Sequence, residues 1–377
     1  MPMMPRGRWQ VLLAVAGTLA AIELLLRLGH VAGPRLWRVD DRLGHALRAG
    51  ATGWCTGEND AWVAVNAQGM RDRERSPDRT PNGFRVAVLG DDVTEARQLP
   101  LGETYPALLE KALQGRAELG GRSAEVLNFG VAEYSTGQEL LQFRHVVASF
   151  RPDIVLLQFS AANDVRDNHP SLGGEGVRPY FRRDGRKVTP DERFAATSAH
   201  RGVAQPFLRL IDGASDYSHC VRLLASALDL GLPGAPGLSA DERAFAPSPN
   251  DTWAEAWVLT ERMLIALRDD CQASGARLMV VGSTYGPQVH PEAAMREELA
   301  KRLGQGDLLY PESRMAPFLV GNGIPFLPLA AVFQRRATTS HAYYHGFGVE
   351  TGQGHWNAAG HVLAAELIAP WLLQHVR

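Results

Sequence analysis

The sequence predicts an α/β fold in which a five-stranded parallel sheet lies between two layers of helices. From residue 84 onward, short apolar and β-branched runs of strand length alternate with stretches of helical period, the pattern of strands joined by crossover helices. The strand-like runs are apolar almost throughout, as expected when both faces of a sheet are covered. A chain of 377 residues can hold one such domain and further segments.

The composition excludes several classes of protein. Hydrophobic residues make up 45% and charged residues 21% of the chain, as in a globular protein, and the formal net charge is −2. Nucleic-acid binding needs a concentrated basic face, for which this charge gives no general support. Cys55, Cys220 and Cys271 lie far apart and form no C-x-x-C pair, so no thiolate zinc site is expected. At most one disulfide can form within the chain, and the sequence leaves its presence open.

Residues 1–30 form a candidate membrane anchor. The run from Trp9 to Leu26 is almost entirely apolar, and about 18 such residues can just cross a bilayer core as a helix. Because His30-Val31-Ala32 fits a cleavage site poorly, we expect an uncleaved anchor. A buried core helix is the alternative, but the terminal position and the basic flank favour the membrane. Arginines lie on both sides of the run, so the positive-inside rule leaves the orientation open.

Residues 31–82 are expected to form a linker that contains one short ordered piece, because they are rich in glycine, proline and charge. Trp62, Val63 and Val65 indicate a short strand, and the segment 66–69 indicates a turn that needs glycine. The main domain is therefore expected over residues 83–377.

The first strand of that domain is predicted over 84–89, ends at Gly90 and is followed at once by Asp91 and Asp92. In an open parallel sheet, ligands bind at the carboxyl ends of the strands, so these two carboxylates are candidate site residues. Either of them can instead cap the next helix. The stretch by itself leaves both interpretations open.

The remaining elements follow in alternation. Four further strands are predicted at 125–129, 153–159, 277–282 and 324–328, and helices at 104–113, at 137–150, before residue 277 with a cap at Asn250, Asp251 or Thr252, and after a cap at Asn357. The crossovers should be right-handed. Residues 165–250 are too many for a crossover and predict an insertion over the carboxyl edge of the sheet, with a hairpin over 180–188 that turns at Asp184-Gly185.

Four polar clusters occupy comparable places in this pattern. Gly90-Asp91-Asp92 follows the first strand, Gly130 the second and Asn163-Asp164 the third, and His355 precedes the last helix. This arrangement resembles the SGNH (GDSL-type) hydrolase family, whose site is made by a Ser in Gly-Asp-Ser, a Gly, an Asn in Gly-x-Asn-Asp and a His in Asp-x-x-His. The resemblance covers residues 84–375 in order. It implies a three-layer α/β/α sandwich with a flavodoxin-like sheet order.

Accessory segments resemble more closely the membrane-anchored, extracytoplasmic branch of that family, found beside exopolysaccharide-modifying proteins. These segments are 65–72, 128–131 and 355–361. The likeness implies a single-pass protein whose domain lies outside the cytoplasm, in the periplasm or at the cell surface. It also implies a carbohydrate or acyl-carbohydrate ligand, no cofactor, and other polysaccharide-modification proteins as possible partners.

The chemistry of the family is acyl transfer. A serine hydroxyl is a poor nucleophile unless a histidine takes its proton, and a carboxylate holds that histidine in the right tautomer. The oxyanion needs fixed donors, which the family supplies from the backbone N–H groups of the Ser and the Gly and from the Asn side chain. By position, the resemblance implies Gly130 and Asn163 as donors and His355 as the base.

Two essential positions depart from the family pattern. Asp92 stands in place of the nucleophilic Ser, and Gly352 in place of the Asp that orients the histidine; in addition, Ala161 replaces a Gly two residues before Asn163. A carboxylate has no hydroxyl proton for a base to remove, and its attack on an ester gives a labile anhydride. Its charge would also occupy the oxyanion donors. The sequence therefore predicts that serine-esterase turnover is largely lost.

Asp92 can take another role if it lies close to His355. The pair would then favour the imidazolium form, raise the pKa of the histidine and form a fixed ion pair. Glu350, five residues before His355, is the candidate replacement for the orienting carboxylate, and Asp91 and Asp164 are candidate supporting residues. Thr94 and Ser160 carry hydroxyl groups nearby but should be displaced from the turn that holds a nucleophile.

A metal site and a sugar-stacking platform were the other possibilities for the C-terminal region. His341, His345, His355 and His361 could suggest a metal site, but the glycine-rich segment 346–354 argues against a rigid helix there, and no metal is expected. The aromatic residues of this region can stack on sugar rings or pack in the core, which is the commoner fate; they are Tyr343, Tyr344, Phe347 and Trp356.

Two functions of different classes follow. The first is an ester hydrolase or O-acetyltransferase lineage acting on cell-surface or exported polysaccharide, with weak or absent activity because Asp92 replaces the nucleophile. The second is a non-catalytic glycan-binding or assembly subunit of an exopolysaccharide system, a pseudoenzyme that keeps the cleft.

Overall fold

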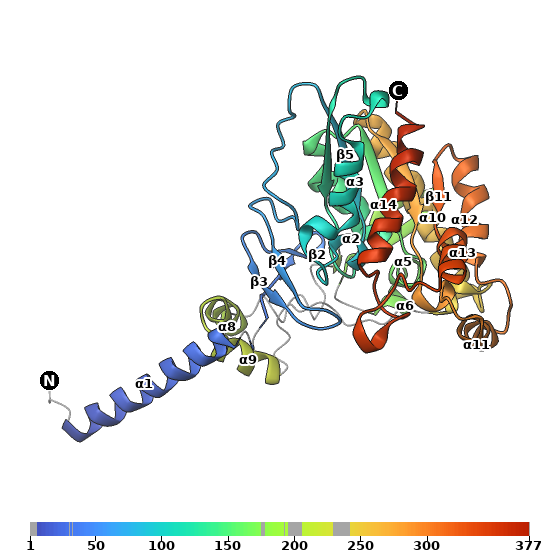
Figure 1. Ribbon diagram of the computed structural model, residues 1–377. Helices are drawn as coiled ribbons and strands as arrows, with labels where there is room; N and C mark the ends of the chain where they lie inside the picture. The colour runs from blue at the N-terminus through green and yellow to red at the C-terminus, as the bar shows by residue number, and fades with distance from the viewer. Residues whose placement is uncertain are drawn as a thin grey trace.

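The computed structural model describes residues 6–376 except 30, 32, 175–177, 192, 195–205 and 229–241. A five-stranded parallel sheet with strand order β11-β10-β7-β5-β6 forms its centre (Figure 1). The strands are β5 (Gly83–Leu89), β6 (Ser123–Asn128), β7 (Ile154–Phe159), β10 (Arg277–Gly282) and β11 (Phe326–Pro328). The predicted parallel sheet is confirmed, and its strand order is the flavodoxin-like one.

Helices cover both faces of the sheet. One face carries α3 (Tyr105–Leu113), α13 (Ala330–Ser340) and α14 (Ala358–Leu373), and the other carries α4 (Thr136–His145), α10 (Asp251–Ala273) and α12 (Tyr310–Gly321). Every residue of β5 is buried, with Val86 and Val88 in one core cluster and Ala87 and Leu89 in the other. Because successive side chains of a strand point to opposite faces, an unbroken apolar strand joins the two cores.

Local sequence signals set the ends of the two long domain helices. The Asn250 side chain accepts a hydrogen bond from the N–H of Trp253 and caps α10. The Asn357 side chain accepts one from the N–H of Gly360 and caps α14. Both caps were among those predicted, and each satisfies a backbone donor that the first turn of a helix leaves unpaired.

The N-terminal helix α1 (Arg6–Leu28) projects away from the domain (Figure 1). Its segment Trp9–Leu28 is long and apolar enough to cross a membrane, and none of that apolar window is buried against the rest of the protein. The same length and composition also suit a signal sequence. The alternative of a buried core helix is wrong, because α1 leaves its apolar side chains exposed.

The segment 31–82 is folded onto the domain rather than extended as a linker. It contains two antiparallel hairpins, β1 (Trp37–Asp40) with β2 (Gly44–Leu47), and β3 (Thr52–Cys55) with β4 (Ala61–Ala64). Val63, Val65 and Met70 belong to the same core cluster as Leu89. Only β4 was indicated by the sequence, because strands of four residues carry little periodic signal.

The insertion between β7 and α10 contains short elements. They are α5 (Asp164–Asp167), α6 (Pro170–Gly173), β8 (Phe181–Asp184), β9 (Lys187–Pro190), α8 (Pro206–Tyr217) and α9 (His219–Ala227). The predicted hairpin is confirmed, since Asp184 pairs with Lys187 across the turn. Helices α8 and α9 lie beside the end of α1 (Figure 1). Cys55, Cys220 and Cys271 are free thiols.

Candidate functional site

The carboxyl ends of β5, β7 and β10 open into a cavity of about 350 Å³. Six different segments bring polar side chains to it. Asp91 and Asp92 follow β5, Glu133 lies in the loop before α4, Asn163 follows β7, Thr284 and Tyr285 follow β10, His355 precedes α14 and Glu58 comes from the β3–β4 hairpin. The structure therefore brings Asp92, Asn163 and His355 together at one cavity, although some 260 residues of sequence separate the first from the last. All three belong to the polar clusters that the sequence places after strands or before the last helix.

The turn after β5 places the two aspartates differently. A Cβ on Gly90 would lie 2.2 Å from Thr94 Oγ1 and 2.6 Å from Gln158 Oε1, so only glycine fits at this tight turn. Asp91 is the N-cap of the short helix α2 (Asp92–Glu95), and its carboxylate accepts the N–H of Val93 at 3.0 Å. Asp92 is the first helical residue and lines the cavity. Both interpretations of the pair therefore apply, one to each residue.

The carboxylate of Asp92 has a partner on each oxygen. Oδ2 accepts a hydrogen bond from the backbone N–H of Glu133 at 2.9 Å. Oδ1 lies 3.8 Å from His355 Nε2, which is longer than a hydrogen bond but within the range of an ion pair. The group that stands in the nucleophile position is thus held between a backbone donor and the histidine.

Glu58, rather than Glu350, orients His355. Glu58 Oε1 lies 2.7 Å from His355 Nδ1, and Oε2 accepts the backbone N–H of His355 at 3.1 Å. This two-point contact fixes the ring and leaves Nε2 directed at Asp92. Glu350 is exposed in a 3₁₀ turn, and the contacts found in the described part of the chain do not join it to His355.

Position 352 has no room for the orienting aspartate. Gly352 has φ +92°, and a Cβ there would lie 2.5 Å from His290 Nε2. An L side chain would be strained in this conformation as well as crowded. The carboxylate that position 352 cannot supply comes instead from the β3–β4 hairpin, 297 residues earlier in the chain than His355.

His355 is a cation in this setting. Burial lowers its pKa, but the hydrogen bond that its ring donates to Glu58 and the charges of Asp92 and Glu58 outweigh burial and raise the pKa to about 9. Burial also acts to raise the pKa of Glu58, yet its contacts with His355 leave that pKa below the ordinary value. Near neutral pH the site therefore holds an imidazolium between two carboxylates. An imidazolium cannot accept a proton, so His355 would have to lose a proton before it could act as a general base.

Glu133, rather than Gly130, supplies the backbone donor at the site. The N–H of Gly130 donates to Asn128 Oδ1 at 2.9 Å, and Gly130 does not line the cavity. Glu133 has φ +64°, a left-handed conformation, and its N–H donates to Asp92 Oδ2. The expectation for Gly130 is therefore wrong, because the chain continues three residues beyond it before turning into the pocket. Asn163 lines the cavity as expected and donates to the carbonyl of Tyr134.

Gly130 has a structural role that can be tested. A Cβ at this position would lie 2.5 Å from the backbone N of Glu95 and 2.6 Å from the backbone C of Thr94. Since backbone cannot move aside as a side chain can, we expect Gly130→Ala to destabilise the domain by about 3 kcal/mol. Thermal unfolding followed by circular dichroism would measure the loss. Gly102→Ala is the matched control, because a Cβ there meets no atom within 4 Å. Equal melting temperatures for the two variants would contradict this packing.

Glu133 also carries an acidic side chain into a site that is already anionic. Burial and the charge of Asp92 raise the pKa of Glu133 to about 8, and the same two causes raise the pKa of Asp91 to about 6. Both carboxyl groups therefore resist ionisation in the folded state, and each costs stability when it ionises.

Replacing Glu133 with glutamine should stabilise the protein at alkaline pH. A carboxyl group whose folded pKa exceeds its unfolded value costs folding stability as pH rises from about 4.5 to about 8. Glutamine keeps the shape and removes that cost. We expect the melting temperature of Glu133→Gln to exceed that of the unaltered protein by about 2 °C at pH 8.5 and to match it at pH 4.5. A difference that is the same at both pH values would show that charge is not the cause.

The other hydroxyl and acidic groups near the site are engaged elsewhere. Thr94 Oγ1 is buried, lies 2.7 Å from the hydroxyl of Tyr105 and donates to Gln158 Oε1. Asp164 lies behind the pocket and accepts the N–H of Ser160 at 2.7 Å, and burial raises the pKa of Asp164 well above its usual range. Thr94 and Asp164 support the strand ends and do not line the cavity, whereas Ser160 does line it.

The C-terminal histidines and aromatic residues mainly pack and cap. His345 Nε2 lies 2.7 Å from Thr284 Oγ1, and His361 Nδ1 accepts the N–H of Tyr105. Burial lowers the pKa of His345 to about 4 and that of His361 to about 3, so both are neutral. Trp356 is buried and stacks on Phe333. Among the residues that the structure describes, no cluster of His, Cys, Asp or Glu could hold a metal ion.

Comparison with known proteins gives the following similarities. No family model matches the sequence. An arylesterase from Vibrio mimicus is 27% identical over 88 residues, which are 23% of this chain and 42% of that protein. The match therefore spans less than half the length of that relative.

Solved structures with a similar course of the chain include an acetyl xylan esterase and a GDSL-like lipase. The acetyl xylan esterase AlAXEase has a TM-score of 0.42 and 13% identity, over 77% of this chain and 100% of that one. A GDSL-like lipase from Bacteroides thetaiotaomicron has a TM-score of 0.35 and 14% identity, over 78% of this chain and 89% of that one. TM-scores of this size assign no chemistry, so the chemistry of the pocket rests on this chain's own residues.

Proposed function

We propose that this protein is a membrane-tethered relative of the SGNH (GDSL-type) ester hydrolases that binds a carbohydrate or acyl-carbohydrate and does not turn it over by a serine mechanism. The observation that carries the proposal is the double engagement of Asp92. Its carboxylate takes the backbone donor of Glu133 at 2.9 Å and faces the His355 imidazolium at 3.8 Å. The groups that would stabilise an oxyanion and activate a hydroxyl are thus already used.

The pocket remains suited to a hydroxyl-rich ligand. Glu58 and Asp92 are acceptors when ionised, Asn163 can both donate and accept, and Tyr285 lines the same cavity of about 350 Å³. Sugar hydroxyl groups can donate to the carboxylates and accept from the amide. A few fixed polar groups around a concave site are the usual basis of such recognition.

We also propose that α1 anchors the protein and that the domain lies outside the cytoplasm, in the periplasm or at the cell surface. The support is the exposed apolar window of α1 at the N-terminus. In that compartment the pocket would meet exported polysaccharide, and other polysaccharide-modification proteins would be the partners. Because Asp92 occupies the nucleophile position, we favour a glycan-binding subunit over an active ester hydrolase.

Hydrolysis of p-nitrophenyl acetate by the full chain in nonionic detergent tests the loss of turnover. We expect the unaltered protein and His355→Ala to give the same rate, equal to that of the buffer with detergent. Activity in the unaltered protein that disappears in His355→Ala would overturn the proposal, because His355 would then be a working base.

Binding is tested separately with a panel of acetylated and deacetylated oligosaccharides, using isothermal titration calorimetry. We expect at least one of them to bind and Asp92→Leu to weaken that binding at least tenfold, which corresponds to about 1.4 kcal/mol. Asp60→Asn is the matched control, because Asp60 is an exposed acid on the same hairpin as Glu58 and does not line the cavity. No binding by any member of the panel would remove the support for a glycan ligand.

A further inference from the structure

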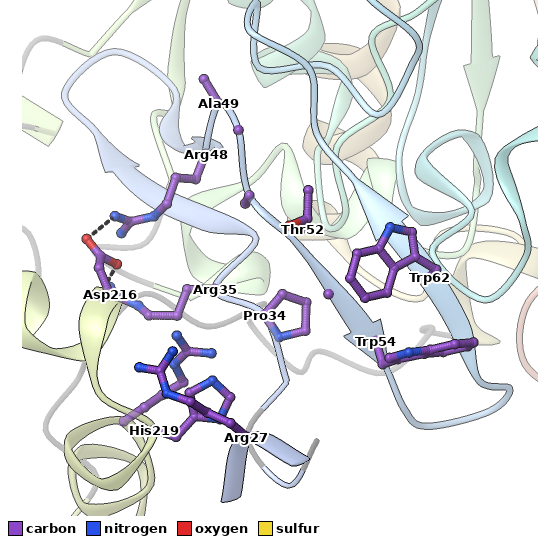
Figure 2. Close-up of a pocket in the computed structure, with 14 residues that line it drawn as sticks. Arg27, Pro34, Arg35, Arg48, Ala49, Thr52, Trp54, Trp62, Asp216 and His219 are labelled. Carbon is purple, nitrogen blue, oxygen red and sulfur yellow. Dashed lines mark hydrogen bonds and ion pairs between the residues drawn. The ribbon is translucent and has the colours of Figure 1, made fainter. Parts of the chain in front are cut away.

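A second cavity, of about 490 Å³, lies beside the N-terminal hairpins, where α1 ends. Figure 2 shows it between the end of α1, the β3–β4 hairpin and the helices α8 and α9. Four arginines and two tryptophans are among the residues that line it. Nothing in the proposed function uses this cavity.

The cavity is strongly basic. Arg27, Arg35, Arg48 and Arg222 line it, and Asp216 is the only acidic residue among the described residues of its lining. Asp216 binds Arg35 at 3.0 Å and Arg48 at 2.8 Å, as the dashed lines in Figure 2 show.

In the part of the chain that the structure describes, two carboxylates bind these arginines. Asp216 binds Arg35 and Arg48, and Glu23, which lies outside the lining, binds Arg27 at 2.7 Å. Burial lowers the pKa of Arg222, and the charges of Arg35 and Arg27 lower it further. The charges of Asp216 and Glu23 raise the pKa of Arg222, but they do not cancel this lowering. An anion in the cavity would relieve the repulsion among these cations.

The cavity also lies beside the segment that can cross a membrane. Arg27 is next to the last residue of the apolar window Trp9–Leu28. Trp54 and Trp62 are 41% and 50% exposed at the rim, with their rings edge to face at 6.0 Å. Exposed tryptophans and arginines at the end of a membrane helix are the groups that prefer the level of the lipid headgroups.

Helices α8 and α9 extend this surface. The Glu23 carboxylate of α1 accepts the N–H groups of His219 and Cys220, so the first turn of α9 is fastened to the end of α1. Large apolar side chains on the two helices and directly after α9 are exposed; they are Leu210, Tyr217, Leu224 and Leu228. A lipid surface would cover them at the depth where α1 leaves the membrane.

We propose that this cavity binds the phosphate group of an anionic membrane lipid, with Arg27, Arg48 and Arg222 around the phosphate and Trp54 and Trp62 against the lipid. Guanidinium groups bind phosphate oxygens through paired, charge-assisted hydrogen bonds, and the surface of a membrane supplies such groups in high concentration. The bound lipid would fix the tilt of the domain relative to the membrane. This inference rests on the membrane placement of α1 in the proposed function, and it is independent of the chemistry at Asp92.

Isothermal titration calorimetry of the full chain in nonionic detergent tests the inference with three probes. They are dihexanoyl phosphatidic acid, dihexanoyl phosphatidylcholine and inorganic phosphate. We expect phosphatidic acid to bind at least tenfold more tightly than either of the others, because it combines anionic charge with acyl chains. Equal binding of inorganic phosphate would overturn the lipid assignment in favour of a free anion, and equal binding of phosphatidylcholine would overturn the charge argument.

The variant Arg27→Gln/Arg48→Gln removes two cations from the cavity and should weaken the binding of phosphatidic acid at least tenfold. The matched control is Arg116→Gln/Arg186→Gln, which removes the same charge from exposed positions outside the cavity. Trp54→Leu/Trp62→Leu is a second variant that keeps the arginines and their contact with Asp216. This variant should bind phosphatidic acid more weakly than the unaltered protein does and should bind inorganic phosphate with unchanged affinity. Equal affinity in all these proteins would refute the inference.

Carbonate extraction of membranes that contain the full chain separates the two proposals. Release of the protein into the soluble fraction would refute the membrane anchor and, with it, this inference. Retention in the membrane together with no binding of phosphatidic acid would refute the lipid site alone. Neither result bears on the ester-hydrolysis test at Asp92.

Discussion

The double variant Asp92→Ser/Glu133→Gly is expected to hydrolyse p-nitrophenyl acetate at least about 100-fold faster than the unaltered protein. Serine at position 92 would place its hydroxyl oxygen near the present position of the Asp92 carboxyl carbon, one bond short of Oδ1, which lies 3.8 Å from His355 Nε2. Removing the Asp92 carboxylate also lowers the pKa of His355, since that charge helps to raise it. A neutral imidazole oriented by Glu58 can then act as the base.

The second substitution restores the oxyanion donor. The N–H of Glu133 now donates to Asp92, and it becomes available once that carboxylate is gone. Glycine at position 133 accepts the left-handed φ of +64° without strain and removes an acid whose ionisation would oppose an oxyanion. No aspartate is needed at position 352, where His290 leaves no space, because Glu58 already binds His355 Nδ1 at 2.7 Å.

Two controls make this result interpretable. Adding His355→Ala to the double variant should return the rate to that of the unaltered protein, because the base is lost. The single variant Asp92→Ser should show a smaller gain, since Glu133 remains beside the oxyanion position. A folded double variant with no gain in rate would show that the pocket lacks something other than the nucleophile. That result would remove the main support for a relationship to the SGNH ester hydrolases.

The second large effect is expected from Glu58→Gln, which should lower the pKa of His355 by at least about one unit from its value of about 9. Burial acts against the charged imidazole, and the hydrogen bond that the ring donates to Glu58 is the largest effect that opposes burial. Glutamine keeps an oxygen near Nδ1 but removes the charge. NMR titration of histidine labelled at the ring carbons measures this pKa, with His355→Asn to assign the signal.

The same ion pairs predict how stability depends on pH. The folded pKa of His355 is about 9 and the unfolded value is 6.5. The stabilisation that the ion pairs give to the folded state is therefore fully present below about pH 6.5 and is lost as pH rises through 9. The contribution should be about 2 kcal/mol, which is less than the full shift implies because the His355 side chain is 28% exposed. Glu58→Gln should therefore lower the melting temperature at pH 6 and change it little above pH 9.5.

Asp60→Asn is the control for this effect, because it removes a negative charge from the same β3–β4 hairpin without touching His355. Its melting temperature should follow that of the unaltered protein at every pH. If Glu58→Gln and Asp60→Asn behave alike, the contact between Glu58 and His355 does not contribute to stability and the electrostatic account of the site is wrong.

The placement of Glu58 changes the role of the N-terminal hairpins. They carry one carboxylate into the pocket and line the basic cavity beside α1 with Trp54 and Trp62. The hairpins therefore connect the two sites physically, and a shift of the β3–β4 hairpin would move Glu58 relative to His355. The segment acts as part of the domain, which is why its core residues Val63 and Met70 are buried with those of β5.

The sequence by itself determined the sheet and the strand ends. Buried strands such as 84–89 and 277–282 are apolar on both faces and end at glycine, so their positions follow from local pattern alone. The polar clusters after β5 and β7 could be placed at one edge because parallel strands share their carboxyl ends. Asp92, Asn163 and His355 were found in this way. The caps at Asn250 and Asn357 were equally local.

Only the tertiary structure decided which backbone donor and which carboxylate complete the site. Gly130 and Glu133 are three residues apart in one loop, and the choice depends on where that loop turns, as the left-handed φ of Glu133 shows. Glu58 lies in a hairpin of four-residue strands, and no local pattern relates it to a histidine 297 residues away. Contacts between distant segments depend on how the elements pack, and a single sequence carries no local signal of that packing.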